Sequence, residues 1–397
     1  MKILRSIHSV NPAVGGPIES IKQSSLNLTR RGHVVEIISL DAPEAPWVRE
    51  FPVKVHALGP GRSSYGYAPA FTRWLRDRHA GYDAVVVQGV WQYNSFGVWR
   101  ALRGTTTPYF VFPHGMLDPW FKRRYPLKHL KKWLYWPWAE YRVLRDATAV
   151  LFTSEAERRL ARESFSLYQC HERVVNYGTA APDIELESAR EDFLNAFPYV
   201  RGKRLLLFLS RLHEKKGCEL LLEAFAAIRK SSDRALHLVM AGPCADAAYL
   251  RSLQDLAAAN GGGENVTFTG MLAGTQKWGA FRAAEAFVLP SHQENFGIAV
   301  AEALACGTPV LISNKVNIWR EIETEGAGYV ENDDLAGTTR LLERWVGTSP
   351  GSRLAMQENA RRCFAKNFEI ERATDSLLEA LDMEANRAEE RDPPWKN

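Results

Sequence analysis

The sequence has few cysteines and no long apolar run. Its five cysteines among 397 residues are scattered without a CxxC pair, so neither a disulfide framework nor a zinc site is indicated. No uninterrupted apolar run approaches the roughly 18 residues that a membrane-spanning helix requires. The first apolar stretch is broken by Arg5 and His8, which favours a buried strand over a signal peptide. We therefore expect a cytoplasmic protein whose contact with a membrane is peripheral.

The length and composition predict two soluble domains of unlike charge. A chain of 397 residues is too long for one ordinary core, and 46% hydrophobic with 24% charged residues is typical of globular proteins. Residues 1–185 hold 25 Lys and Arg against 16 Asp and Glu, whereas residues 186–397 hold 25 against 30. The basic first half should therefore meet the more anionic partner or surface.

Short β-rich apolar runs alternate with helical patterns in both halves, which predicts parallel sheets with crossover helices. The expected strands are Lys2–His8, Val34–Leu40, Ala84–Gln88, Tyr109–Pro113, Ala149–Thr153, Arg204–Ser210, Leu236–Ala241, Val266–Thr269, Ala286–Pro290 and Pro309–Ser313. We expect an α/β protein with two Rossmann-like, doubly wound domains facing an interdomain cleft, since ligands bind beyond the carboxyl ends of parallel strands.

The segment YGTAAPDIE at residues 177–185 breaks the periodicity with Gly and Pro and predicts the domain boundary. We expect an N-terminal domain over residues 1–182 and a C-terminal domain over residues 183–370, opened by a helix around Ser188–Phe197. The pattern of Arg353–Ala388 is helical. Residues 371–397 are expected to form a helix and a frayed tail, with the helix packing back towards the N-terminal domain.

The most specific motif is a glutamate followed by seven residues and a second glutamate, Glu294 and Glu302, between two predicted strands. Glu294 falls in the loop at a strand's carboxyl end, where it can face sugar hydroxyls. Glu302 falls in a helix starting near Phe296, where it can accept hydrogen bonds from a ribose. The backbone N–H groups of Asn295, Phe296 and Gly297 favour a phosphate or a polarised oxygen. Alternatively, Glu294 only caps the helix and Glu302 is solvated.

A second motif, FLSRLHEKKG, follows the first strand of the C-terminal half. Arg211 and Lys216 lie five residues apart on one loop and can close on a diphosphate from two sides. They would stabilise the charge that develops as a nucleoside diphosphate leaves. An exposed basic helix start is the simpler interpretation, and Lys215 fits that interpretation best.

Two loops of the first half follow predicted strands. The turn at Gly15 and Gly16 allows the backbone to approach a phosphate or an acceptor, although a tight turn explains it equally well. Within FPHGMLDPW, His114 can hydrogen-bond a donor sugar or stabilise an oxocarbenium-like transition state, and Asp118 can orient an acceptor hydroxyl. A lone His at a strand end is also often structural.

In their order, these motifs resemble those of the group 1, or GT4, retaining glycosyltransferases, which have the GT-B fold. The resemblance implies that Glu294 contacts the donor sugar, Glu302 the ribose, and Arg211 and Lys216 the diphosphate. It also places Gly16 near the distal phosphate and His114 beside the donor. The family's loops around the nucleotide base are matched by the remaining donor-side residues, Gly242, Pro243 and Gly270.

No Asp-x-Asp pair of the metal-dependent glycosyltransferases is present, so we expect no metal and no cofactor beside the nucleotide-diphosphate sugar donor. The N-terminal domain is expected to bind the acceptor and the C-terminal domain the nucleotide sugar, as the resemblance implies.

The segment Trp120–Trp138 interleaves six Lys and Arg with seven aromatic residues. This mixture suits an anionic membrane interface, and it also suits single-stranded nucleic acid. A helix that is partly packed into the core with a solvated basic face is the third interpretation. For a membrane, the expected contacts are Lys122, Arg123, Arg124, Lys128, Lys131, Lys132, Trp133 and Trp136.

The sequence thus predicts a metal-independent hexosyltransferase acting on a saccharide or lipid-linked saccharide in bacterial polysaccharide or lipopolysaccharide assembly, at the inner face of the plasma membrane. A nucleotide-sugar epimerase of the same fold is one alternative. A nucleic-acid-binding module built on Trp120–Trp138 is another, but it leaves the two glutamates and two cations unexplained, so we expect no nucleic-acid partner.

Overall fold

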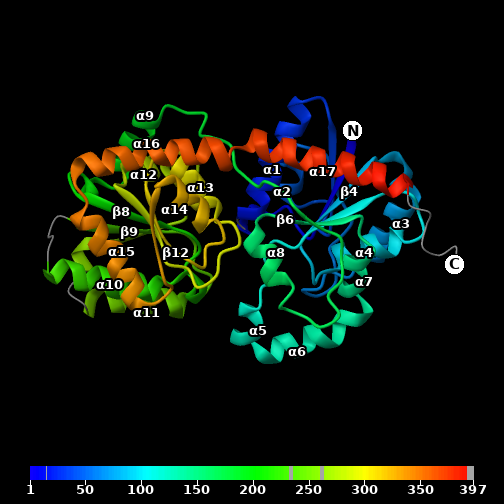
Figure 1. Ribbon diagram of the computed structural model, residues 1–397, viewed down its shortest axis with the longest axis horizontal. Coiled ribbons are helices and arrows are strands. Elements are labelled where there is room, and N and C mark those ends of the chain that lie inside the picture. Colours follow the sequence, from blue (N-terminus) through cyan, green and yellow to red (C-terminus); the bar gives the residue numbers. More distant parts are fainter. Residues whose placement is uncertain (15, 232–235, 260–262, 391–397) are drawn as a thin grey trace. The chain divides into compact units, whose positions relative to one another are not determined.

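The computed structural model describes residues 1–390 except 15, 232–235 and 260–262. The chain forms two compact units (Figure 1). Unit 1 combines Met1–Gly178 with the C-terminal segment that begins at Ile370, and unit 2 spans Thr179–Glu369. The expected boundary at residues 182 and 183 falls just after the division between the units.

Unit 1 contains a seven-stranded parallel sheet in the order β3-β2-β1-β4-β5-β6-β7. Its order reverses between β1 and β4, the position at which ligands bind doubly wound sheets. All five residues of the strand AVVVQ are buried, as in a parallel sheet covered on both faces. The strands are β1 (Lys2–Ile7), β2 (Val34–Ser39), β3 (Val55–Ala57), β4 (Ala84–Gln88), β5 (Tyr109–Phe112), β6 (Ala149–Phe152) and β7 (Glu172–Val174).

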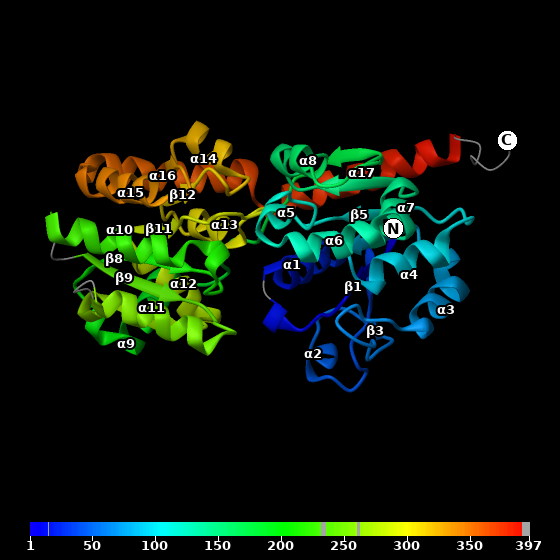
Figure 2. The same cartoon turned by 90° about the horizontal axis from the view of Figure 1, so that it is seen from below.

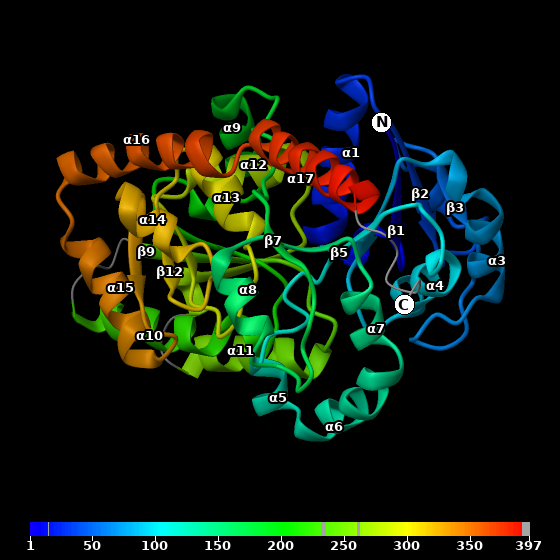
Figure 3. The same cartoon turned by 45° about the vertical axis from the view of Figure 1, so that its right-hand side comes forward.

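Helices cover both faces of this sheet. On one face Leu377 and Leu381 of the last helix share a core with Ile3 and Leu28, and α17 runs beside α1 (Figures 1 and 3). The other face is covered by α3, α4 and α7, with α3 beside α4 (Figure 2). The helices of unit 1 are α1 (Gly16–Arg30), α2 (Pro46–Arg49), α3 (Pro69–Arg78), α4 (Tyr93–Leu102), α5 (Trp120–Arg124), α6 (Pro126–Tyr135), α7 (Glu140–Arg145), α8 (Glu155–Ala161) and α17 (Ile370–Glu390).

Unit 2 repeats the architecture with a six-stranded parallel sheet in the order β10-β9-β8-β11-β12-β13. Its order reverses between β8 and β11. The strands are β8 (Arg204–Leu209), β9 (Leu236–Ala241), β10 (Val266–Gly270), β11 (Ala286–Leu289), β12 (Val310–Ser313) and β13 (Gly328–Glu331). The helices are α9 (Leu186–Ala196), α10 (Cys218–Ser231), α11 (Ala247–Ala259), α12 (Gly274–Ala283), α13 (Ile298–Ala305), α14 (Trp319–Glu325), α15 (Leu335–Gly347) and α16 (Pro350–Asn367).

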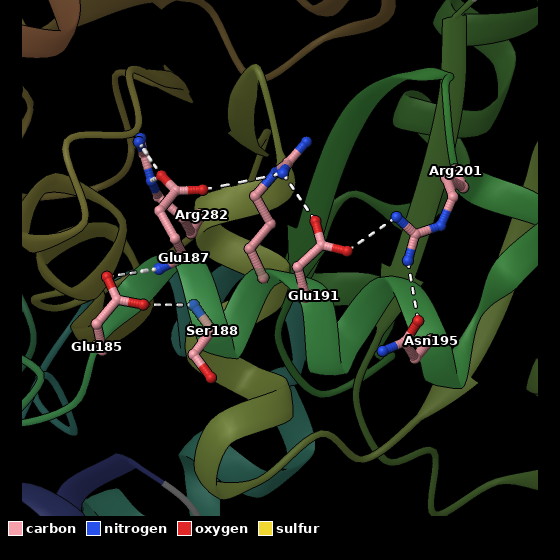
Figure 4. Close-up of polar contacts among 8 residues, drawn as sticks. Glu185, Glu187, Ser188, Glu191, Asn195, Arg201 and Arg282 are labelled. Carbon is pink, nitrogen blue, oxygen red and sulfur yellow. Dashed lines mark hydrogen bonds and ion pairs between the residues drawn. The ribbon is translucent and has the colours of Figure 1, made fainter.

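The helix that opens unit 2, α9, is fixed by close packing on α12. A Cβ atom on Gly279 would lie 2.0 Å from the carbonyl oxygen of Ala189, so only glycine allows this approach. The visible polar contacts of α9 are exposed: Glu187 pairs with Arg282, and Glu191 lies 2.9 Å from Arg201 (Figure 4). Exposed pairs contribute little to stability. The packing around Gly279 therefore positions α9.

The expected α/β architecture of two Rossmann-like parallel sheets is confirmed, with two kinds of correction. The edge strands β3, β7 and β13 were not predicted. The helical pattern of Arg353–Ala388 forms two helices instead of one, because the chain breaks at Phe368, whose carbonyl accepts the N–H of Thr179 at 3.0 Å and whose ring is buried. The final residues 391–397, part of the expected frayed tail, lie outside the described residues.

Candidate functional site

Lys216 and Glu294 form a partly buried ion pair at the carboxyl ends of neighbouring strands. Lys216 follows β8, Glu294 follows β11, and the lysine is 6% exposed. Burial alone would raise the pKa of Glu294, but the charges of Lys216, Lys215 and Arg211, together with the hydrogen bond from Lys216, hold that pKa below its usual value. Glu294 is therefore ionised, and its sequence-based interpretation as a simple helix cap is insufficient.

Backbone contacts fix the two loops to each other. The N–H of His292 donates to the carbonyl of Lys215 at 2.9 Å. Gly217 has a left-handed φ of 67°, and a Cβ there would lie 2.3 Å from the carbonyl oxygen of Pro290. The loop that carries Lys216 therefore lies against the loop that carries Glu294, with no space for a larger residue.

A third loop, after β12, holds the backbone of Glu294. The N–H of Glu294 donates to Lys315 at 3.0 Å, and its carbonyl accepts the N–H of Asn317 at 3.0 Å. Three successive strand ends of the sheet thus determine where this carboxylate lies. Such support gives the first-contact residues of a binding site a defined position.

Arg211 supplies a second cation on the β8 loop. Its side chain is exposed, and no ion pair to it occurs among the residues that the structure describes. It nevertheless contributes to the low pKa of Glu294, so its charge acts on the same region as that of Lys216. The loop thus combines the buried, paired Lys216 with the half-buried Lys215 and the exposed Arg211.

The loops after β9 and β10 support the β8 loop. A Cβ on Gly242 would lie 1.9 Å from the carbonyl oxygen of Ser210, and Pro243 accepts the N–H of Leu212 at 2.9 Å. The N–H of Gly242 donates to Gly270 at 2.8 Å. These contacts give Gly242 and Pro243 a structural function beside Arg211, while Gly270 has open space where a side chain would lie.

The second glutamate of the motif lies on a helix that begins later than expected. α13 starts at Ile298 after Gly297, whose φ is 80°, and Phe296 is buried against Phe368. The interpretation of Glu302 as solvated is wrong, because it is 3% exposed and accepts a hydrogen bond from Lys277 at 2.7 Å. The side-chain oxygen of the remaining loop residue, Asn295, accepts a hydrogen bond from the side-chain amide of Asn317 at 3.5 Å.

In unit 1, His114 lies after β5 with a left-handed φ of 49°. One ring nitrogen, Nε2, is 2.7 Å from Oε1 of Gln88, the last residue of β4. Burial, assisted by the charge of Arg5, lowers the pKa of His114 to about 4. A neutral ring that donates from Nε2 presents Nδ1 as an acceptor, so His114 can accept a hydrogen bond from a hydroxyl group and carries no charge at neutral pH.

Buried Glu157 on α8 fastens the loop of His114. Its carboxylate accepts the N–H of Gly115 at 2.6 Å and both the N–H and the hydroxyl of Thr153 at 2.8 Å. The sequence analysis missed Gln88, Glu157 and Lys277. Gln88 was recognisable as a polar residue ending an apolar strand, and Glu157 as the last residue of a Ser-x-x-Glu capping pattern.

The other N-terminal candidates have local structural functions. α1 begins at Gly16, and Gly15 lies outside the described residues. Asp118 is buried and accepts the N–H of Trp120 at 2.8 Å, which caps the start of α5. This bond gives the carboxylate of Asp118 a local structural function.

The basic aromatic segment forms α5, α6 and a 3-10 turn at Trp136–Trp138. The expectation of membrane contact at Trp136 is wrong, because this side chain is 2% exposed and stacks on Phe165 at 4.5 Å. Lys132 is partly buried 4.6 Å over the ring of Trp91, and burial lowers its pKa to about 8. The other expected contacts, Lys122, Arg123, Arg124, Lys128, Lys131 and Trp133, are exposed.

Apolar side chains of α6 are exposed among these cations. Leu127 is 77% exposed, Leu130 55%, Trp133 48% and Leu134 62%. The third interpretation of the segment, a helix partly packed into the core, holds for Trp136 and for one side of α6, where the ring of His129 stacks on Phe165 at 4.6 Å; the leucines and Trp133 lie on its exposed side. Figures 1 and 3 show α5 and α6 at the periphery of unit 1.

Glu140 is fully buried at the start of α7. It accepts the N–H of Trp91, which has a left-handed φ of 76°, and the hydroxyl of Ser95, each at 2.8 Å. Burial raises the pKa of Glu140 to about 7 against these hydrogen bonds and the charge of Lys132. The carboxyl group of Glu140 thus holds the loop after β4. Above about pH 7 it becomes a buried negative charge, which destabilises the folded state.

We expect Glu140→Gln to increase stability at pH 8 but not near pH 4.5. An acid whose pKa is raised on folding stabilises the native state below its unfolded pKa, and this contribution is lost as the pH rises through about 7. The difference should reach on the order of 2 kcal/mol. Melting temperatures from pH 4.5 to 8.5 test this, with Glu163→Gln at an exposed position as control. A constant offset between variant and wild type would contradict the raised pKa.

No group of three or more His, Cys, Asp or Glu side chains that could hold a metal ion occurs within the described residues. None of the helices described there is long and apolar enough to cross a membrane.

Two family models match the chain. Residues 190–363 match the model described as glycosyl transferases group 1, and residues 15–178 match the glycosyl transferase 4-like domain. Alpha-monoglucosyldiacylglycerol synthase of Streptococcus pneumoniae is 26% identical over 380 residues, covering 90% of this chain and 81% of that protein. D-inositol 3-phosphate glycosyltransferase of Saccharomonospora viridis is 29% identical over 250 residues, covering 60% and 56%. The structure of sucrose-phosphate synthase from Thermosynechococcus elongatus matches with a TM-score of 0.77 and 20% identity, covering 96% and 98% of the two chains.

Proposed function

The chain belongs to the group 1, or GT4, glycosyltransferases of the GT-B fold, and we propose that it transfers a hexose from a nucleotide-diphosphate sugar, with retention, to a saccharide or lipid-linked saccharide. The observation that carries the proposal is the group of Lys216, Glu294 and Arg211 at adjacent strand ends of unit 2. This arrangement supplies a fixed carboxylate for sugar hydroxyls and two cations for a diphosphate.

The leaving group explains why both cations are needed. As the bond between the anomeric carbon and the diphosphate oxygen breaks, negative charge accumulates on the diphosphate, and fixed cations stabilise it. Arg211 can bind two oxygens with its planar guanidinium, whereas Lys216 is a point charge held by Glu294. The departing diphosphate accepts the proton of the acceptor hydroxyl in a front-face displacement. No metal ion takes part in this proposal.

The remaining donor contacts follow from the same loops. Glu294 binds sugar hydroxyls, the backbone of Asn295, Phe296 and Gly297 faces the diphosphate or the sugar, and Glu302 binds the ribose. The hydrogen bond from Lys277 at 2.7 Å holds this carboxylate in place inside the fold. The loops of Gly242, Pro243 and Gly270 surround the base. Of the two units, unit 2 accordingly binds the nucleotide sugar.

Unit 1 binds the acceptor in this proposal. Its strand-end loops carry neutral His114, whose Nδ1 accepts a hydrogen bond from a sugar hydroxyl, together with Gly16 and Asp118. A lipid-linked acceptor is favoured by the exposed leucines and lysines of α6. It is also favoured by the similarity to the alpha-monoglucosyldiacylglycerol synthase of Streptococcus pneumoniae, which is named for a glucosylated lipid. Bacterial polysaccharide or lipopolysaccharide assembly at the inner face of the plasma membrane fits these features.

A panel of nucleoside diphosphates and their sugars tests the donor assignment. Binding to the native chain should raise its melting temperature, and the best donor should then be consumed only when an acceptor is added. EDTA should leave the rate unchanged. Conversion of the sugar nucleotide without any acceptor would establish the epimerase alternative instead, and salt-sensitive oligonucleotide binding without nucleotide-sugar binding would establish the nucleic-acid module.

Replacing the two most exposed leucines of α6 tests the membrane assignment. The double variant Leu127→Ser and Leu134→Ser should bind anionic vesicles about threefold to tenfold more weakly, because these side chains lose the apolar surface that enters the interface. Leu354→Ser, at a 60% exposed position of α16, is the matched control. Vesicle sedimentation measures both, and equal binding by all three proteins would exclude α6 as the contact.

A further inference from the structure

Unit 1 contains a groove that none of the proposed roles uses. It has a volume of about 570 Å³ and lies over the helical layer formed by α3, α4 and the start of α7. Its wall is a mixture of arginine and aromatic side chains. The lining residues used below are Arg76, Phe96, Trp99, Arg100, Arg103, Trp138 and Arg142.

Four arginines line the groove. No ion pair to Arg76, Arg100, Arg103 or Arg142 is found in the part of the chain that the structure describes. Elsewhere in unit 1, exposed arginines do meet acids, as Arg162 meets Glu172. Four like charges around one cavity repel each other, so a ligand with negative charge would relieve the repulsion.

The aromatic side chains give the groove a rigid apolar wall. Trp99 is buried, its Nε1 donates to Asp146 at 2.7 Å, and its ring stacks on Phe96 at 5.4 Å. The guanidinium groups of Arg103 and Arg142 lie 5.3 and 5.8 Å from the centre of the same indole ring. The indole therefore holds two of the four cations in place.

The groove is distinct from the strand-end loops that carry His114. A crossover helix runs antiparallel to the strands that it connects, so the last turn of α4 lies away from the carboxyl ends of those strands. Arg100 and Arg103 belong to that last turn and to the residue after it. The acceptor loop and the groove therefore occupy different parts of unit 1.

An apolar surface leads from the groove to α6. Trp138 lines the groove and is 70% exposed, and it ends the turn that follows α6. Phe96 of the groove contacts Tyr135, the last residue of α6, with ring centres 6.4 Å apart. A molecule held by the arginines thus has the aromatic rings of Phe96, Tyr135 and Trp138 beside it.

We propose that this groove binds the phosphate headgroup of an anionic phospholipid. Guanidinium groups bind phosphate oxygens in pairs, and the exposed ring of Trp138 suits the glycerol and first acyl carbons at the interface. A soluble phosphate compound would share the arginines but would not need the aromatic rim. The proposal rests on the peripheral membrane attachment of the proposed function, to which it adds a defined lipid site.

Calorimetry with a short-chain lipid tests the site apart from the general attraction of a charged surface. Full-length protein is titrated with monomeric dihexanoyl phosphatidylglycerol, dihexanoyl phosphatidylcholine and glycerol 3-phosphate. We expect binding of the phosphatidylglycerol, and at least tenfold weaker binding of the other two probes. The double variant Arg100→Gln and Arg103→Gln should lose at least tenfold in affinity for phosphatidylglycerol.

Two further variants make the result independent of folding defects. Arg76→Gln removes a groove cation that makes no contact with Trp99 and should weaken binding severalfold, whereas Arg73→Gln removes an exposed cation of the same helix outside the groove and should not. Equal effects of Arg73→Gln and Arg76→Gln, or no binding by wild type, would overturn the proposal. Glycerol 3-phosphate binding as tightly as the lipid would overturn the lipid as the source of the phosphate. Nucleoside diphosphate binding, measured in the same variants, should stay unchanged. If the wild type binds no nucleoside diphosphate, the donor assignment is refuted, but the proposed lipid site is not.

Discussion

Arg211→Ala and Lys216→Ala should each lower kcat for sugar transfer by about 100-fold to 1,000-fold, the loss measured when one fixed donor to a developing charge is removed. Both cations act on the same region, since both contribute to the low pKa of Glu294. In the proposed reaction their charge matters most after the bond to the diphosphate has lengthened. We therefore expect kcat to fall more than affinity for the donor.

The two variants differ in what else they disturb. Lys216→Ala leaves the partly buried carboxylate of Glu294 without its partner, which destabilises the folded state, so its melting temperature should fall too. Arg211 is exposed and is not the ion-pair partner of Glu294, so the Arg211→Ala variant should fold normally. Lys203→Ala, an exposed cation just before β8 at the opposite end of that strand, is the control and should retain most activity. Near-normal transfer by Arg211→Ala would remove the diphosphate assignment.

The strands that the sequence predicted are those whose physical signal is local. Buried parallel strands such as β4 and β9 are continuous apolar runs, and their bounds coincide with the prediction. The missed strands VHA and ERV at the sheet edges are three residues long and partly exposed. They pair only because a neighbouring strand offers hydrogen bonds, which no local pattern reveals.

The site divides in the same way between local and long-range causes. Glu294, Lys216 and Arg211 were recognisable because each belongs to a short motif after a strand. Lys277, which pairs with Glu302, lies 25 residues away on another helix, and no spacing rule connects the two. Partners of this kind depend on how α12 packs against α13, so they emerge only with the tertiary structure.

The error at Trp136 has a comparable origin. The composition of Trp120–Trp138 is amphipathic as a whole, but the chain turns at the end of α6 and directs this one indole into the core beside Phe165. The leucines of α6, which the sequence analysis did not single out, are more exposed than most of its aromatic residues. Composition indicated an interface, and only the turn determines which side chains form it.

Gly217→Ala should reduce kcat/KM by about 100-fold or more without changing any group that contacts substrate. Its left-handed φ of 67° disfavours alanine, and the new Cβ would lie 2.3 Å from the carbonyl oxygen of Pro290. The β8 loop must then move away from the β11 loop, which separates Lys216 from Glu294. A displacement of about 1 Å in a positioning element can cost this factor.

Gly202→Ala separates the two causes of the loss. Gly202 belongs to the same unit and has a φ of 76°, but no atom lies within 4 Å of its added Cβ. It therefore carries the backbone strain without the collision, and should lower the melting temperature slightly while leaving the rate of transfer intact. Equal rates of sugar transfer by Gly217→Ala and Gly202→Ala would show that the close approach of the β8 and β11 loops does not align the cations with the carboxylate. Arg211 and Lys216 would then be positioned by contacts other than the one between Gly217 and Pro290.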